Sequence, residues 1–163
     1  MIATLSALIV AASEPTGADP GWAQVSAWHA LSKLTVEMSI GTLEGEAGPQ
    51  VYWVRRTLSG PNRQTATITT DTRRCAGILP VLKALNTLPT PRIDTPLRET
   101  GDTGGVTNVT VIADGVGYSL HVPADYGRRA GDGLTITSNV DTPLADWVER
   151  LQTAVRACVP EKP

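Results

Sequence analysis

The feature that most constrains this fold is an apolar stripe near the C-terminus. Apolar residues recur there at steps of three and four: Leu144, Trp147, Val148, Leu151, Ala154, Val155 and Cys158. This spacing predicts one amphipathic helix, with Thr142 as its N-cap and Pro143 at the first helical position, where the missing N–H costs nothing. Pro160 ends the helix. A helix with so broad an apolar face must be covered by a sheet.

Alternating segments supply the strands of that sheet. Leu34–Ile40 places its apolar residues on one face and its polar residues on the other, which is typical of a half-buried strand. Turn signals at 59–62 and at Asp114-Gly115 separate further segments. We expect strands over 34–40, 51–58, 63–70, 106–113, 117–123 and 134–138. The secondary structure of the segment 22–31 is left undecided, because its apolar residues fit a short helix only roughly.

A second helix is expected in the middle of the chain. Its apolar stripe consists of Cys75, Ile78, Leu79, Leu82 and Leu85. Pro80 removes a backbone donor, so we expect an irregular first turn over 75–79 and regular helix over 79–88. Asp71 or Thr72 can cap it, since either side chain can accept a hydrogen bond from a free first-turn N–H.

The predicted order is three strands, a helix, three strands and a helix. Neither half can bury its apolar surface alone. The pattern therefore predicts an α+β fold: a two-layer sandwich of a twisted antiparallel sheet of about six strands, with both main helices on one face. One domain is expected over 22–160. Since the chain has no Phe, we expect an aliphatic core filled out by its four tryptophans: Trp22, Trp28, Trp53 and Trp147.

The first residues suggest export. Residues 1–12 are apolar and end in small residues, as in a signal peptide, although no Lys or Arg precedes the apolar run. Residues 13–21 have the composition of a flexible linker. The run is too short to span a bilayer, so we expect no transmembrane anchor. The expected location is the bacterial periplasm or the extracellular medium. If residues 1–12 instead belong to the fold, the protein is cytoplasmic.

Two cysteines allow a single pairing, Cys75 with Cys158. They lie at the start of the first predicted helix and at the end of the second, and these ends meet if the helices pack antiparallel. A bridge would close a loop of about 84 residues, which the chain-entropy model values at about 4–5 kcal/mol at most. In a cytoplasmic protein the pair would be two buried thiols.

The sequence contains no recognisable catalytic or cofactor-binding motif. The net charge is −2, which gives no electrostatic reason to bind nucleic acid. The histidines are His29 and His121, and their spacing from the cysteines matches no zinc pattern, so no metal and no cofactor is expected. His121 should face solvent beside Ser119. An alternative hypothesis is a small hydrolase in which His121 acts with a neighbouring Ser or Asp. The candidates are Ser119, Ser138, Asp114 and Asp125.

Paired arginines are the only repeated polar feature. Arg55 and Arg56 lie in a strand and must point to opposite faces. Arg73-Arg74 are expected at a helix start, where positive charge is unfavourable unless an anion or a carboxylate neutralises it. We expect a nearby acidic loop to supply that carboxylate. With Arg128-Arg129 they form a weak candidate anion or interaction site.

The leading hypothesis is an exported, non-enzymatic binding module whose partner is another envelope or extracellular protein. It depends on the missing catalytic set and on long loops at 41–50, 89–105 and 124–133, because loops on a rigid scaffold often carry recognition. The alternatives are the small hydrolase that uses His121 and a structural component of the envelope.

Overall fold

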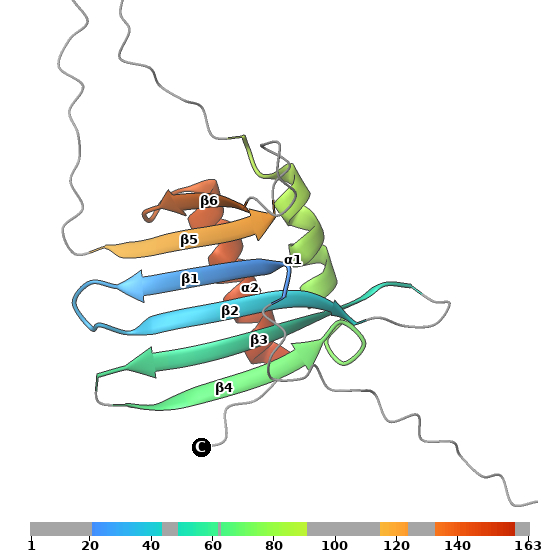
Figure 1. Ribbon diagram of the computed structural model, residues 1–163, viewed down its shortest axis with the longest axis horizontal. Coiled ribbons are helices and arrows are strands. Elements are labelled where there is room, and N and C mark those ends of the chain that lie inside the picture. The colour runs from blue at the N-terminus through green and yellow to red at the C-terminus, as the bar shows by residue number, and fades with distance from the viewer. Residues whose placement is uncertain (1–20, 44–48, 62, 91–114, 124–132, 159–163) are drawn as a thin grey trace, which may run out of the picture.

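The computed structural model describes residues 21–43, 49–61, 63–90, 115–123 and 133–158. These residues form six strands, two α-helices and one 3₁₀ turn, labelled in Figure 1. In chain order the elements are β1 (Ala23–His29), β2 (Thr35–Leu43), β3 (Val51–Gly60), β4 (Arg63–Asp71), α1 (Ile78–Ala84), η1 (Leu85–Thr87), β5 (Val116–Pro123), β6 (Gly133–Ser138) and α2 (Pro143–Cys158).

The strands form one antiparallel sheet in the order β4-β3-β2-β1-β5-β6. The segment 22–31, for which the sequence favoured neither helix nor strand, therefore contains a strand, β1, at the centre of this sheet. Ala23, Val25 and Ala27 are buried on one face, while Gln24 and Trp28 point to the other. Two of the buried residues are alanines and the outward residue is a tryptophan, so the alternation is hidden in the sequence.

The predicted order of elements also needs correction. Four strands, not three, precede the first helix, and the predicted strand 106–113 lies outside the described residues. It was expected to form a hairpin with the strand after Asp114-Gly115. Along Tyr118–His121, however, β5 is paired with β1 on one side and with β6 on the other. The remaining predicted strands are confirmed to within a few residues at each end.

The first helix, α1, begins at Ile78, within one residue of the predicted start of regular helix at 79. Gly77 is its N-cap and makes no side-chain capping bond, so neither Asp71 nor Thr72 caps it. Pro80 is the third helical residue. The first four N–H groups of a helix have no partner within the helix, so proline costs no hydrogen bond there. The irregular segment accordingly lies before Ile78, and the helical stretch ends in η1 near Thr87.

The C-terminal helix begins as predicted. The Oγ1 of Thr142 accepts a hydrogen bond of 3.1 Å from the backbone N–H of Ala145, and Pro143 is the first helical residue. Leu144, Trp147, Val148, Leu151 and Val155 are buried. The stripe seen in the sequence is therefore the face that joins the core.

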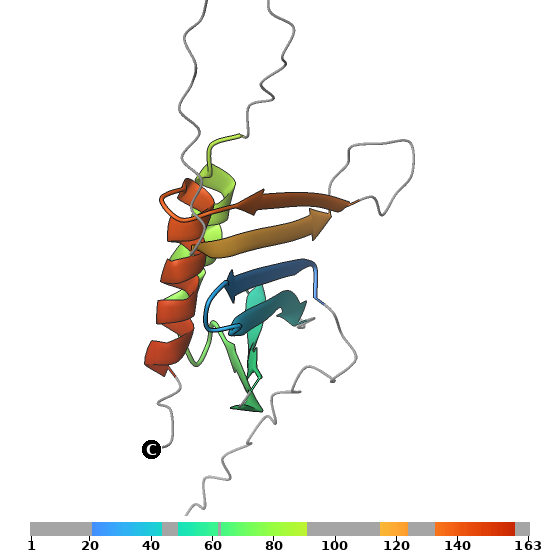
Figure 2. The ribbon, with the colours of Figure 1, turned by 90° about the vertical axis from the view of Figure 1, so that its left-hand side faces the viewer.

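Both helices lie on the same side of the sheet (Figure 2). Their buried residues form a single hydrophobic cluster with the inward residues of β1, β2, β3 and β5, including Val25, Met38 and Ile40. The indole N–H of Trp147 donates a 2.7 Å hydrogen bond to the carbonyl oxygen of Val81, which ties α2 to α1. As expected, Arg55 and Arg56 point to opposite faces, and Arg56 is buried on the helix side.

The expected disulfide is present between Cys75 and Cys158, with their Cα atoms 5.7 Å apart. Cys75 lies in the turn before α1, and Cys158 is the last residue of α2. The bridge joins the start of one helix to the end of the other, so the helices run antiparallel, as the pairing required. No helix in the described part of the chain is long and apolar enough to cross a membrane. The expected signal peptide, residues 1–12, lies outside the described residues, as does the linker up to residue 20.

Candidate functional site

The face of the sheet that turns away from the helices is the candidate interaction surface, and we call it the open face. Strand pairing aligns its side chains in rows across the sheet. Two adjacent rows are Thr135, His121, Gln24, Ser39, Arg55 and Thr69, and then Thr137, Ser119, Ser26, Glu37, Thr57 and Thr67. Every one of these side chains can donate or accept hydrogen bonds, and most are hydroxyls.

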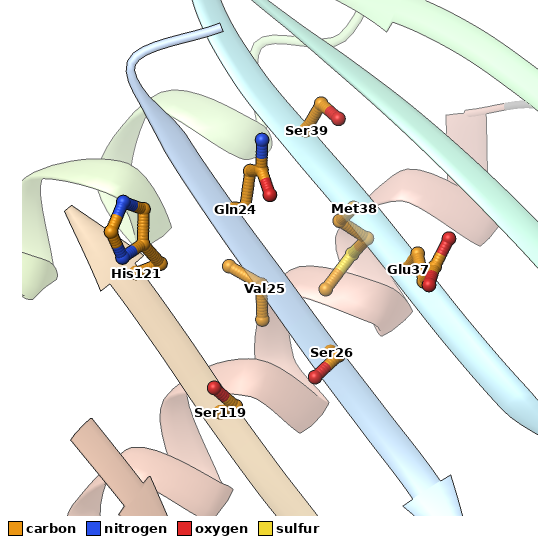
Figure 3. Close-up of a pocket in the computed structure, with 8 residues that line it drawn as sticks. All are labelled: Gln24, Val25, Ser26, Glu37, Met38, Ser39, Ser119 and His121. Atoms are coloured by element: carbon orange, nitrogen blue, oxygen red, sulfur yellow. The ribbon is translucent and has the colours of Figure 1, made fainter. Parts of the chain in front are cut away.

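A shallow depression of about 410 Å³ lies in the middle of this face (Figure 3). Its polar lining comes from three neighbouring strands: Gln24 and Ser26 of β1, Glu37 and Ser39 of β2, and Ser119 and His121 of β5. Val25 and Met38 form part of the lining between these residues, although both are buried. The depression can hold a polar group of a partner.

Exposed apolar side chains occur at the β1–β2 end of the sheet. Trp28 is 42% exposed and Leu31 is 75% exposed, and both belong to the β1–β2 hairpin. Trp28 was expected in the core. It instead lies on the open face, where its indole packs against the backbone of Gly117, its pairing partner on β5. The sequence signal that could have placed Trp28 outward is the alternation of Ala23, Val25 and Ala27, which is weak because two of these residues are alanines.

A second tryptophan on the open face is fully buried. Trp53 lies opposite Gly41, and its indole occupies the space that a Cβ at Gly41 would need. The guanidinium of Arg55 stacks over the ring at 5.2 Å from its centroid. The Trp53 indole N–H has no hydrogen-bond partner among the described residues. Trp53 therefore fills a gap in the sheet surface, while Trp28 remains accessible.

His121 faces solvent beside Ser119, as predicted. Its Nδ1 lies 2.9 Å from the Oγ1 of Thr135 on β6. No carboxylate is hydrogen-bonded to His121 within the described residues. Of the other residues named for a hydrolase, Ser138 accepts a hydrogen bond from Thr142, and Asp114 and Asp125 lie outside the described residues. A Ser–His–acid chain is therefore not assembled in the part of the molecule that can be seen.

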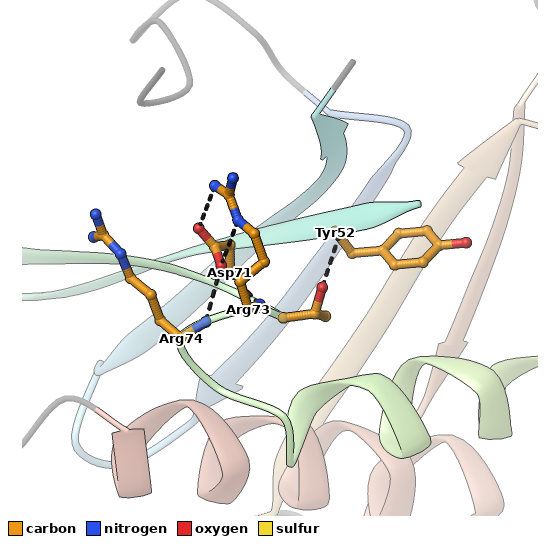
Figure 4. A network of polar contacts seen from close by, with 5 residues as sticks. Tyr52, Asp71, Arg73 and Arg74 are labelled. Atoms are coloured by element: carbon orange, nitrogen blue, oxygen red, sulfur yellow. Dashed lines mark hydrogen bonds and ion pairs between the residues drawn. The ribbon is translucent and has the colours of Figure 1, made fainter. Parts of the chain in front are cut away.

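The arginine pair at 73–74 lies in the turn after β4, ahead of the helix rather than at its start (Figure 4). The carboxylate that pairs with this arginine turn belongs to Asp71, not to an acidic loop. One oxygen of Asp71 accepts the backbone N–H groups of Arg73 and Arg74, at 2.8 and 3.1 Å. The other oxygen lies 2.9 Å from the Arg73 guanidinium. On the other side of this turn, Thr72 accepts a hydrogen bond of 3.2 Å from the backbone N–H of Tyr52.

These contacts shift the pKa values of both charged groups, Asp71 and Arg73. Burial acts to raise the pKa of Asp71, but the hydrogen bonds from Arg73 and Arg74 outweigh it and the pKa is lowered overall. The ion pair raises the pKa of Arg73. Arg74 remains an exposed cation with no side-chain partner among the described residues. Arg128 and Arg129, the other half of the predicted anion site, lie outside the described residues. Within the described residues, the predicted anion site is therefore reduced to one exposed cation without an ion-pair partner, Arg74.

No group of three or more His, Cys, Asp or Glu side chains that could hold a metal ion is found among the described residues. Over the described residues the fold is a disulfide-bridged α+β arrangement in which one face of the sheet carries no helix. Compared with family models, with curated proteins and with solved structures, the chain matches none.

Proposed function

We propose that this chain is an exported, non-enzymatic binding module, built as a two-layer α+β sandwich, which binds another envelope or extracellular protein through its open face. The observation that carries the proposal is the position of Trp28 and Leu31. They are two of the three large apolar side chains that are strongly exposed in the described residues, and they lie in one hairpin. The third, Leu134, lies on β6.

Protein interfaces are typically organised as a few aromatic or aliphatic anchors surrounded by polar groups that exclude water. The end of the open face has this composition. Trp28 rests on Gly117 and presents its other side to solvent, and Ser26, Glu37 and Ser119 form the adjacent polar row. An indole supported in this way loses little side-chain entropy when a partner covers it.

Charge also favours a protein partner over nucleic acid. Across the two polar rows, Glu37 and Arg55 are oppositely charged, and the chain as a whole is slightly acidic. Phosphate-backbone binding requires an accumulation of positive charge. The open face offers hydrogen bonds and one apolar anchor region instead.

The test is differential capture with matched surface variants. The purified, tagged protein is cross-linked to envelope fractions of the producing cell, beside the variant Leu31→Lys and the variant Ser26→Lys. The control is Leu134→Lys, which places the same charge on the third exposed apolar residue. We expect one partner to be captured by the unmodified protein and by the control, and to be lost with Leu31→Lys and Ser26→Lys. Equal capture by all four proteins would contradict the proposal.

A further inference from the structure

Strand β4 forms one edge of the sheet. An edge strand leaves one row of backbone N–H and C=O groups unpaired, and proteins usually protect such edges with lysines, prolines, bulges or covering segments. β4 has the sequence RQTATITTD over nine residues. It contains no lysine and no proline, and its charged residues, Arg63 and Asp71, are confined to its two ends.

The direction of the unpaired groups follows from one hydrogen bond. The N–H of Thr72 donates to the carbonyl oxygen of Tyr52 on β3, at 2.9 Å. In an antiparallel pair, alternate residues turn their backbone groups toward the partner strand and the residues between them turn outward. Thr70, Ile68 and Ala66 therefore face β3, whereas Thr69 and Thr67 present their N–H and C=O groups at the free edge.

The regular part of this edge is Ala66–Asp71. The register with β3 is uninterrupted from Trp53–Asp71 to Leu58–Ala66, and the irregularity lies beyond it, next to the hairpin turn. At the other end, the carbonyl of Asp71 is already used, because it accepts the N–H of Cys75 at 2.8 Å. Thr67 and Thr69 are exposed, and among the described residues nothing pairs with their outward backbone groups.

We propose that two copies of this chain associate edge to edge through β4, antiparallel and centred on Ile68. This register places Thr67 opposite Thr69 of the second copy, and Thr69 opposite Thr67, which closes about four backbone hydrogen bonds. Ile68 then lies opposite Ile68 of the other copy in a closely spaced pair, and Ile68 is half-buried on the helix side of β4.

The self-complementary sequence favours a second copy over an unrelated strand. Within β4 the symmetric register pairs Thr67 with Thr69 and Ile68 with Ile68, and it places Thr65 opposite Asp71, so no like charges meet inside the strand. A two-fold axis perpendicular to the sheet relates the copies, so both open faces lie on the same side of one continuous sheet. β1, which carries Trp28, is separated from β4 by two strands and stays free. Two anchor regions side by side would raise the avidity for a repeated partner.

The test exploits the outward N–H of Thr67. Thr67→Pro removes a donor that the monomer does not use, since proline is tolerated on an edge strand where its nitrogen faces solvent. Thr67→Val is the matched control, because it keeps the backbone N–H. Sedimentation velocity over a wide concentration series should show a monomer–dimer equilibrium for the unmodified protein and for Thr67→Val. The dimer should be lost with Thr67→Pro.

A second measurement protects the result against misfolding of the proline variant. In the unmodified protein, hydrogen exchange of the Thr67 and Thr69 amides should slow as the protein concentration rises, while that of the β6 amides should not change. A protein that stays monomeric throughout the series would overturn the inference. A dimer whose exchange protection appears on β6 rather than β4 would overturn it as well. Neither result bears on the binding proposed for Trp28 and Leu31.

Discussion

The phenol of Tyr118 on β5 donates a 2.6 Å hydrogen bond to the carboxylate of Glu149 on α2. This bond connects the sheet to a helix, because Tyr118 is buried on β5 whereas Glu149 is an exposed residue of α2. Tyr118→Phe removes it without leaving a cavity. We expect a loss of about 1–2 kcal/mol of unfolding free energy, measured by denaturant titration. Glu149→Gln is the companion variant, since a neutral acceptor should retain part of that energy.

The same pair makes the stability of the fold depend on pH in the alkaline range. Burial, then the hydrogen bond to Glu149, and then the negative charges of Glu149 and Asp146 raise the pKa of Tyr118 above its ordinary value of 10.0. A raised pKa in the folded state means that the stabilisation is complete below the unfolded value and is lost as pH rises above it. We therefore expect stability to fall above about pH 10. Ultraviolet titration should show a late phenolate step that is absent from Tyr118→Phe, and an identical titration of the two proteins would contradict this.

The disulfide should be the largest single contribution to stability. Cys75 and Cys158 are 83 residues apart in the sequence, and such a loop is valued at about 4–5 kcal/mol as an upper limit. The double variant Cys75→Ser/Cys158→Ser should unfold at a markedly lower denaturant concentration, and added reductant should shift the unmodified protein but not the variant. Alkylation of the unreduced protein should add no mass. Two added alkyl groups would show that the bridge is absent from the isolated protein.

The turn after β4 should depend more on Asp71 than on its ion pair. Asp71 accepts two backbone N–H groups, whereas the Arg73 side chain is 47% exposed. We expect Asp71→Ala to lose about 1–3 kcal/mol and Arg73→Ala less than about 1 kcal/mol. Because the folded-state pKa of Asp71 is lowered, its stabilisation is present above the unfolded value of 3.8 and is lost as pH falls through the folded value. Acid unfolding curves of the two variants should differ accordingly.

Substitutions of the glycines that lie under the two tryptophans should differ in their cost to stability. A Cβ at Gly41 would overlap the buried indole of Trp53, and one at Gly117 would overlap the exposed indole of Trp28. Trp28 can move into solvent and Trp53 cannot. We expect Gly41→Ala to cost about 1–3 kcal/mol, as overpacking does, and Gly117→Ala to cost less. The control is Gly77→Ala, where nothing lies within 4 Å of the added carbon and no loss is expected. Equal thermal shifts at positions 41 and 77 would contradict the packing argument.

The sequence alone determined the features that depend on local order. The three- and four-residue spacing from Leu144 to Cys158, with Thr142 and Pro143 before it, specifies α2 because helix caps and stripes are set by near neighbours. Alternation located most of the strands, and two cysteines allow a single pairing. His121 was placed on the solvent side by the two-residue period of its strand.

Only the tertiary structure decided which segments become neighbours. β1 has a weak pattern of its own and becomes a strand because β2 and β5 supply hydrogen bonds on both sides, a contact between distant parts of the chain. The same pairing turned Trp28 outward and gave it Gly117 as support. Asp71 caps a turn rather than a helix because the chain bends before Ile78 to bring Cys75 to the end of α2. Such contacts are set by packing across the whole molecule, which residue spacing does not encode.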